Sequence, residues 1–210
     1  MRVAGILCAL AALLLAPMAE ATDLRVAVAG ADGRPVADAV VTVRVARAPP
    51  GRIQFPWPMA IAQHHMEFDP FVLIAPAGAT VAFPNLDPVR HHVYSFSPAG
   101  PFELRLYGRD ESRSVAFRTA GVIAIGCNIH DNMSAFIYVV DTPYAAKTDA
   151  EGVATLRDLP PGAATLRVWH PYSRAPDGHT ERAITLAQSG QASERFELRL
   201  RAPRDAGGHY

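Results

Sequence analysis

The stretch Cys127-Asn128-Ile129-His130-Asp131-Asn132-Met133 lies between two apolar runs, Gly121–Gly126 and Ser134–Val140. Short apolar runs of this kind are typical of buried strands, so the stretch is predicted to be a short loop joining two strands. It supplies a thiol, an imidazole and a thioether, and a second imidazole, His91, precedes another apolar strand at Val93–Phe96. A thiolate, two imidazoles and a thioether form the ligand set of a blue-copper centre. The sequence therefore predicts one mononuclear type 1 copper site and one-electron transfer.

The cysteine count supports a metal. The chain has two cysteines, and Cys8 falls in the N-terminal apolar segment, so Cys127 has no partner for a disulfide after export. By itself, a lone cysteine is also compatible with a small buried apolar residue. The histidine and methionine at fixed spacing favour a metal, and structural zinc sites, the other candidate, rarely recruit methionine.

The N-terminus predicts export. A positive start at Met1-Arg2, an apolar run from Val3 to Pro17 and the small residues of Ala19-Glu20-Ala21 describe a signal peptide over residues 1–21. The apolar run is shorter than the roughly 20 residues of a membrane span. We therefore expect cleavage after Ala21, no membrane insertion afterwards, and a periplasmic protein if the source is a Gram-negative bacterium.

The rest of the chain is predicted to be all-β. Apolar residues alternate with polar ones in several segments, as half-buried antiparallel strands require. Glycine- and proline-rich turns separate these segments and no long helical period occurs. The alternating positions are Leu24, Val26 and Val28; Val41, Val43 and Val45; Leu166 and Val168; and Phe196, Leu198 and Leu200.

Three segments carry a resemblance to the cupredoxins, the plastocyanin, azurin and amicyanin group. They are Pro76–Asp87, which reads Pro-Ala-Gly-Ala-Thr-Val-Ala-Phe-Pro-Asn-Leu-Asp; His91-His92-Val93; and Gly126–Met133. The short gap between the loop histidine and the methionine resembles amicyanin. The resemblance implies a Greek-key β-sandwich, His91, Cys127, His130 and Met133 as copper ligands, and His130 as the electron port to a transiently docked redox partner. Ile129, Met133 and Phe136 are candidates for an apolar docking patch or for the core.

The same block also resembles the periplasmic cupredoxin-like proteins often labelled methylamine utilization proteins. In that group Cys-Asn-Ile-His-x-x-Met is followed by Asp-Thr-Pro-Tyr, which stands here at Asp141–Tyr144. The label is a family name and implies no role in methylamine oxidation.

The flanking segments resemble a carboxypeptidase-regulatory-like, or transthyretin-like, sandwich through Thr148-Asp-x-x-Gly and Leu159-Pro-Pro-Gly. We predict a copper domain over 53–141, inserted into a second small β-sandwich made of 22–52 and 142–203, followed by a flexible tail at 204–210. One continuous larger sandwich is the alternative.

The surroundings of the first ligand depart from the cupredoxin pattern. Cupredoxins usually have asparagine directly after that histidine, whereas this chain has His92. The family register selects His91 as the ligand. Asn85 or Asp87 could form hydrogen bonds that orient the ligand loop, or could shape the turn before Pro88; we favour the turn.

The remaining histidines are weaker candidates. His64-His65-Met66 contains copper-binding side chains but lacks a fourth partner at a predictable spacing, so we expect a strand with one histidine inward and one outward. His170 and His179 are expected to be ordinary surface residues.

Composition narrows the function. The formal net charge is zero, which favours neither nucleic acid nor an anionic membrane as a partner. A copper oxidase or reductase would need a further copper bound by histidines, for which the sequence shows no constellation, so no enzyme is predicted. An electron carrier is the first hypothesis and a copper-trafficking module the second. A scaffold that has lost its metal disagrees with four intact ligand residues.

Overall fold

The computed structural model describes residues 21–201. The predicted signal peptide, apart from its last residue, and the predicted tail lie outside this range. The described residues form strands and a single short 3-10 helix, η1 (Pro176–Gly178), in agreement with the all-β prediction. No helix within residues 21–201 has the length and apolar character needed to cross a membrane.

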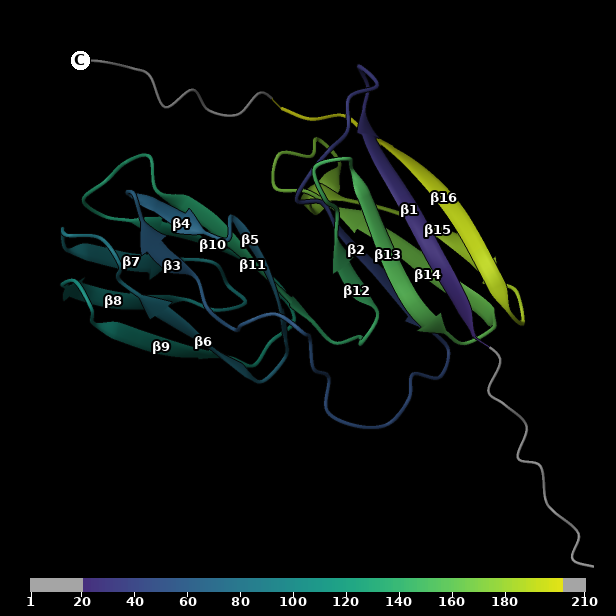
Figure 1. The fold of residues 1–210 in the computed structure, drawn as a ribbon, viewed down its shortest axis with the longest axis horizontal. Coiled ribbons are helices and arrows are strands. Elements are labelled where there is room, and N and C mark those ends of the chain that lie inside the picture. Colours follow the sequence, from purple (N-terminus) through teal and green to yellow (C-terminus); the bar gives the residue numbers. More distant parts are fainter. Residues whose placement is uncertain (1–20, 202–210) are drawn as a thin grey trace, which may run out of the picture.

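The central part of the chain folds as a two-layer sandwich (Figure 1). One layer is a five-stranded sheet in the order β5-β11-β10-β7-β8, and the other contains the pair β6-β9 and the hairpin β3-β4. Apolar side chains from both layers form one buried cluster, which includes Cys127 and Met133. The strands are β3 (Ala62–His64), β4 (Glu67–Asp69), β5 (Val72–Pro76), β6 (Ala79–Pro84), β7 (His91–Ser95), β8 (Phe102–Tyr107), β9 (Ser112–Phe117), β10 (Gly121–Cys127) and β11 (Ser134–Val140).

The two ends of the chain pair with each other in a second sandwich. β1 runs parallel to β16 and antiparallel to β13, and β2 pairs with β12 and β14, to which β15 adds an edge. Strands from before and after the central part therefore complete the same sheets. The carboxypeptidase-regulatory-like identity of this unit stays a prediction. Its strands are β1 (Thr22–Gly30), β2 (Val40–Val45), β12 (Ala145–Lys147), β13 (Val153–Leu159), β14 (Gly162–Trp169), β15 (His179–Leu186) and β16 (Gly190–Leu198).

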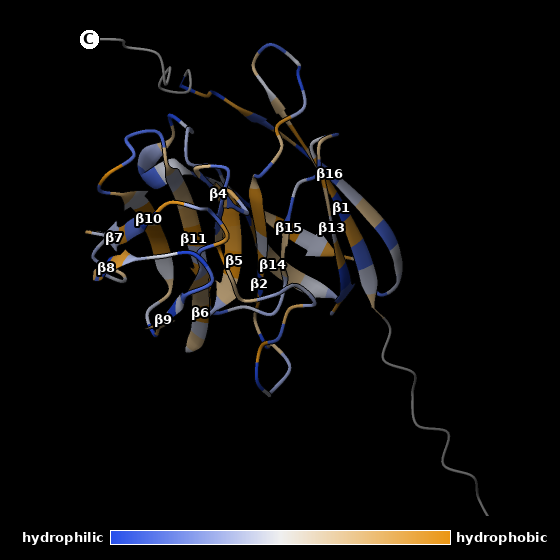
Figure 2. Ribbon diagram, turned by 60° about the vertical axis from the view of Figure 1, so that its left-hand side comes forward, coloured by the Kyte–Doolittle hydropathy of each residue, from blue (hydrophilic) through white to orange (hydrophobic). Residues whose placement is uncertain are grey.

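The two sandwiches meet along β5 and β11, which are buried on both faces. In β11, Ile137 and Val139 point into the central core, whereas Tyr138 and Val140 pack against Trp169 of β14. Double burial explains why these strands are continuously apolar instead of alternating. Figure 2 shows this orange band between the two units. A packed apolar contact of this kind holds the central sandwich against the second sandwich.

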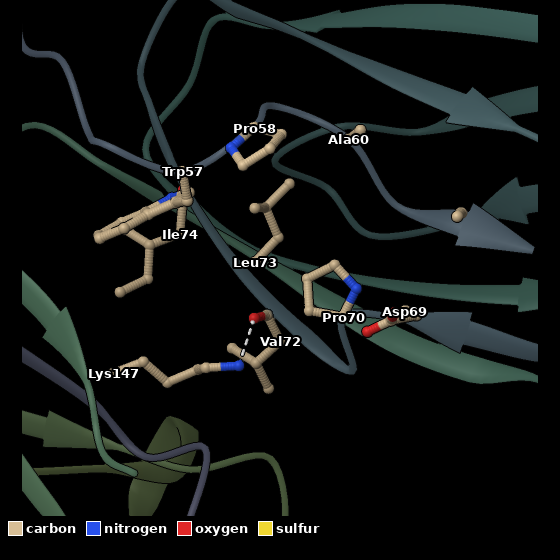
Figure 3. A pocket seen from close by; sticks show the side chains of 10 residues that line it. Trp57, Pro58, Ala60, Asp69, Pro70, Val72, Leu73, Ile74 and Lys147 are labelled. Carbon is tan, nitrogen blue, oxygen red and sulfur yellow. Dashed lines mark hydrogen bonds between the residues drawn. The ribbon is translucent and has the colours of Figure 1, made fainter.

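A hollow of about 380 Å³ opens beside this contact (Figure 3). Its walls are mostly apolar, and Trp57 and Leu73 contribute to them. Lys147 reaches its edge, where the ammonium donates to the carbonyl of Val72 and pairs with Asp38 at 2.6 Å. The only lysine of the chain is therefore engaged in holding the two units together.

Some strand bounds differ from those expected, and the expectation for His64 and His65 was wrong. The strand expected at Val93–Phe96 is β7, which already begins at His91, and β4 and β8 were not predicted. His64 and His65 are both exposed, because the turn of the β3-β4 hairpin lies at His65 and Met66 instead of beyond them. The two histidine rings stack with their centroids 3.8 Å apart.

The histidines of the second sandwich were also misjudged as surface residues. His170 is buried, and His179 lies 2.7 Å from the hydroxyl of Tyr138, across the contact between the two units. Turns close to both histidines in the sequence had suggested a surface position.

The burial of His170 predicts a pH-dependent stability. Burial lowers the pKa of His170, although the Asp38 carboxylate and a backbone hydrogen bond with Ala37 oppose the shift. An unfolded histidine titrates near 6.5, so below about pH 6.5 the unfolded chain binds this proton more readily than the folded protein. The stabilisation from a neutral His170 is thus present above about pH 6.5 and is lost as the pH falls.

We expect the Tm of metal-free His170→Gln to be lower than that of the wild type at about pH 7.5. At about pH 5 the difference in Tm between the two proteins should be smaller. Thermal denaturation followed by circular dichroism measures both differences. The exposed His64→Gln variant is the control and should track the wild-type pH profile. An equal His170→Gln deficit at both pH values would contradict the assignment.

Candidate metal centre

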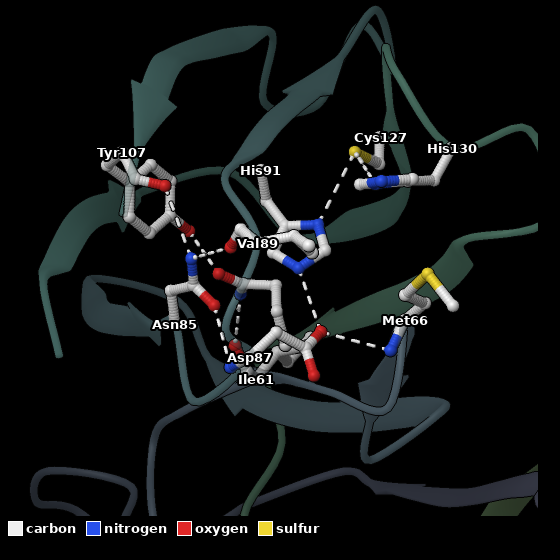
Figure 4. A network of polar contacts seen from close by, with 10 residues as sticks. Ile61, Met66, Asn85, Asp87, Val89, His91, Tyr107, Cys127 and His130 are labelled. Atoms are coloured by element: carbon white, nitrogen blue, oxygen red, sulfur yellow. Dashed lines mark hydrogen bonds and ion pairs between the residues drawn. The ribbon is translucent and has the colours of Figure 1, made fainter. Parts of the chain in front are cut away.

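Three donor side chains converge at one end of the central sandwich. His91 begins β7, Cys127 ends β10, and His130 lies in the loop from β10 to β11. The sulfur of Cys127 lies 3.8 Å from Nδ1 of His91 and 3.5 Å from Nδ1 of His130. The three ligand atoms all lie within 4.8 Å of one another (Figure 4). Within residues 21–201 this is the one group of three or more such side chains placed to share a metal ion.

The donor set fits a soft transition-metal ion. Thiolate and imidazole bind such ions at about 2.0–2.3 Å, so two ligands of one ion can be up to about 4.6 Å apart. Both sulfur–nitrogen separations fall within that limit. A thiolate with two imidazoles is the equatorial set of a blue-copper site, and this donor chemistry suits copper.

Backbone hydrogen bonds hold the loop between β10 and β11 in its conformation. The N–H of Cys127 donates to the carbonyl of Met133 at 3.3 Å, and the N–H of Met133 donates to the carbonyl of His130 at 3.1 Å. The N–H of Asn128 donates to the carbonyl of His92 at 3.0 Å, which joins the loop to β7. A backbone contact thus links the two segments that carry the candidate ligands.

Met133 is almost fully buried, at 2% exposure, in the same apolar cluster as Cys127. The two residues also line one hollow together. The predicted weak axial ligand therefore lies on the inner side of the loop, and its role as a ligand stays a prediction.

A buried carboxylate holds the first histidine. Oδ2 of Asp87 lies 2.8 Å from Nε2 of His91, and these side chains are 3% and 0% exposed. Burial lowers the pKa of His91 against the opposing effect of Asp87, which keeps the ring neutral and able to bind a metal. Burial raises the pKa of Asp87, but hydrogen bonds from the Met66 N–H and from His91 outweigh it, so the pKa is lowered.

The neighbouring histidine takes a different direction. Nε2 of His92 lies 3.0 Å from Oε1 of Glu103 on β8, and the side chain is 16% exposed. The period of two in β7 therefore places His91, and not His92, beside the thiol.

The segment before β7 contacts the donor cluster more directly than the sequence predicted. Asn85 shapes the turn, as expected: its Oδ1 accepts from the N–H of Asp87, and its Nδ2 donates to the carbonyls of Val89 and Tyr107. Asp87, in contrast, contacts a predicted ligand directly. The only sequence signal was an aspartate four residues before the histidine, which by itself is too common to assign.

One side of the centre approaches the surface. His130 is partly exposed and its neighbour Ile129 is 48% exposed, whereas His91 and Cys127 are buried. Of the other residues considered for an apolar patch, Met133 belongs to the core and Phe136 packs against Phe71 and Trp169.

Comparison with known proteins gives structural likenesses only. No protein-family model matches the chain, and no curated protein matches it. A copper-containing nitrite reductase from Thermus scotoductus SA-01 is 28% identical over 45% of this chain, with a TM-score of 0.38. The match spans only 25% of the length of that enzyme.

Two smaller proteins are matched over nearly their whole length. A purple cupredoxin from Nitrosopumilus maritimus is 22% identical over 39% of this chain and 98% of its own, with a TM-score of 0.35. A reduced amicyanin variant is 18% identical over 47% of this chain and 99% of its own, with a TM-score of 0.37. These two likenesses to cupredoxins extend over 39% and 47% of this chain.

Proposed function

We propose that this protein binds one copper ion in a type 1 site and carries single electrons between partner proteins in the periplasm. The observation that carries the proposal is the convergence of the Cys127 sulfur with Nδ1 of His91 and of His130, at 3.8 and 3.5 Å. When bound, copper would supply a Cu(II)/Cu(I) couple that changes by one electron.

The residues around the site suit electron transfer without bond-making chemistry. His91 would bind through Nδ1, Cys127 through its thiolate after losing its proton, and His130 through Nδ1; Met133 would be the weak axial donor. His91 is 0% exposed and Cys127 is 5% exposed, so water is kept away from these two donors. Packed strands on both sides hold the donors in place, so little of the protein has to move when the charge changes.

His130 is the proposed electron port. It is the donor of the three that reaches the surface, and the exposed Ile129 beside it offers an apolar contact. Electron-transfer complexes bury little surface, so a small patch is sufficient. The redox partner would dock transiently over this end of the sandwich. Export by the predicted signal peptide would place the exchange in the periplasm.

Titration of the metal-free protein with Cu(II) tests the proposal. We expect an intense thiolate-to-copper absorption in the visible range, an EPR signal with narrow copper hyperfine splitting, and a reversible one-electron wave in voltammetry. A colourless Cu(II) complex would overturn the type 1 site. A coloured complex with slow electron exchange and rapid transfer of copper to a chelator would instead support copper trafficking.

A further inference from the structure

The carboxylate of Asp87 forms a hydrogen bond with His91, one of the candidate ligands, and places a negative charge next to the donor cluster. Oδ2 of Asp87 and Nε2 of His91 are 2.8 Å apart, and both side chains are almost completely buried. In Figure 4, Asp87 and Cys127 contact opposite nitrogens of the His91 ring. The imidazole therefore bridges a carboxylate and the donor cluster.

This arrangement determines which nitrogen of His91 is available. The carboxylate accepts a hydrogen bond, so the ring proton resides on Nε2 and the lone pair is left on Nδ1, facing the Cys127 sulfur. A carboxylate behind a metal-binding histidine fixes the ring orientation and makes the imidazole a stronger donor. The negative charge close to the centre also favours the more highly charged Cu(II) over Cu(I).

The β3-β4 hairpin holds the carboxylate in place. The backbone N–H of Met66 donates to the same Oδ2 at 3.0 Å. His65 and Met66 have φ values of 54° and 58°, which is the backbone of a tight two-residue hairpin turn without the glycine usually found there. The N–H of Leu86 donates to the carbonyl of Gln63 at 2.9 Å, which fastens the hairpin to the loop that carries Asp87.

We propose that Asp87 is a positioning residue that orients His91 and lowers the reduction potential of the copper centre. The inference rests on the proposed function, because it concerns the tuning of that same site. The hairpin at residues 64–67 supports it through the Met66 N–H. Asp87 thus links the conformation of this exposed hairpin to the strength of a ligand in the core.

Asp87→Asn in the copper-loaded protein tests the role of the charge. Asparagine has the same shape, and its Oδ1 can accept from both His91 and Met66, so the fold and the visible band should persist. We expect the ratio of the Cu(II) affinity to the Cu(I) affinity to fall about tenfold. A tenfold change is at the low end of the losses in metal affinity caused by mutating residues that hydrogen-bond to a metal ligand. By the conversion for a one-electron couple, this is a rise of about 59 mV in the potential measured by voltammetry.

Asp131→Asn is the matched control. Asp131 is exposed beside His130, and in the described structure its side chain makes no hydrogen bond or ion pair with His91, Cys127 or His130. The Asp131→Asn substitution therefore removes a nearby charge without removing a contact to any candidate ligand. We expect its effect on the potential to be a small part of that of Asp87→Asn. An unchanged potential in Asp87→Asn, or equal rises in both variants, would overturn the proposal.

A measurement on the wild type keeps the proposal testable if Asp87→Asn does not fold. In the metal-free protein, where no ion fixes the tautomer, nitrogen-15 NMR should find the His91 proton on Nε2 and protected from exchange with solvent. A proton on Nδ1, or a rapidly exchanging Nε2 proton, would contradict the role of Asp87. A wild-type protein that gives no type 1 spectrum would refute the proposed function instead, so the two failures are distinguishable.

Discussion

Replacing Cys127 with serine should abolish the visible absorption of the copper-loaded protein completely. That absorption requires a thiolate bonded to Cu(II), and a hydroxyl group is neither soft nor ionised at neutral pH. The side chain of Cys127 is 5% exposed at the end of β10, where serine differs by only one atom, so the sandwich should still form. Optical and EPR titrations with Cu(II), beside the wild type, measure the loss.

Circular dichroism of the two metal-free proteins is the control for folding. Matching spectra with a lost band would assign the loss to the ligand atom alone. A band that survived in Cys127→Ser would show that the sulfur does not bind the metal, and the type 1 interpretation would then be wrong.

The second large effect should separate two adjacent histidines. His91→Ala should remove the blue absorption, because this ring points at the Cys127 sulfur from inside the sandwich. His92→Ala should keep it, because that ring turns outward to Glu103. The same Cu(II) titration of both variants makes the comparison, and His92→Ala is the matched control for an alanine in the same strand.

His91→Ala should also destabilise the protein more than His92→Ala. It leaves the buried Asp87 carboxylate without one of its hydrogen-bond partners, and such a loss costs about 1–3 kcal/mol or more for a charged group. Chemical denaturation of the metal-free variants measures the difference. Loss of the band in His92→Ala but not in His91→Ala would show that the register is displaced by one residue.

The sequence could single out candidate donors because their chemistry is local. Cys127 ends β10, and His130 and Met133 lie in the short loop that follows it, so local sequence alone keeps the three residues near one another. The all-β class was likewise predictable, because period-two alternation reports directly on a half-buried strand.

Contacts between segments that are far apart in the chain could not be predicted from the sequence in the same way. The alternation of apolar and polar residues cannot show what packs on the outer face of β11. Both faces of this strand are apolar, because the second sandwich covers the outer face at Tyr138 and Val140. His170 looked like a turn residue at the surface, but the structure buries it beside Asp38 and Ala37, which are far away in the chain. Such burial comes from elements far away in the chain, which no local pattern encodes.

The amino-acid sequence by itself determined the kind of protein and the kind of site: strands, a short loop with a thiol, an imidazole and a thioether, and a histidine upstream. Only the tertiary structure decided that Asp87, held by the Met66 N–H, lies behind His91 on the side opposite the thiol. The physical reason is that residue types and their spacing specify which donors are present. The direction and hydrogen bonding of a side chain depend on strand register and on a hairpin from another layer of the fold.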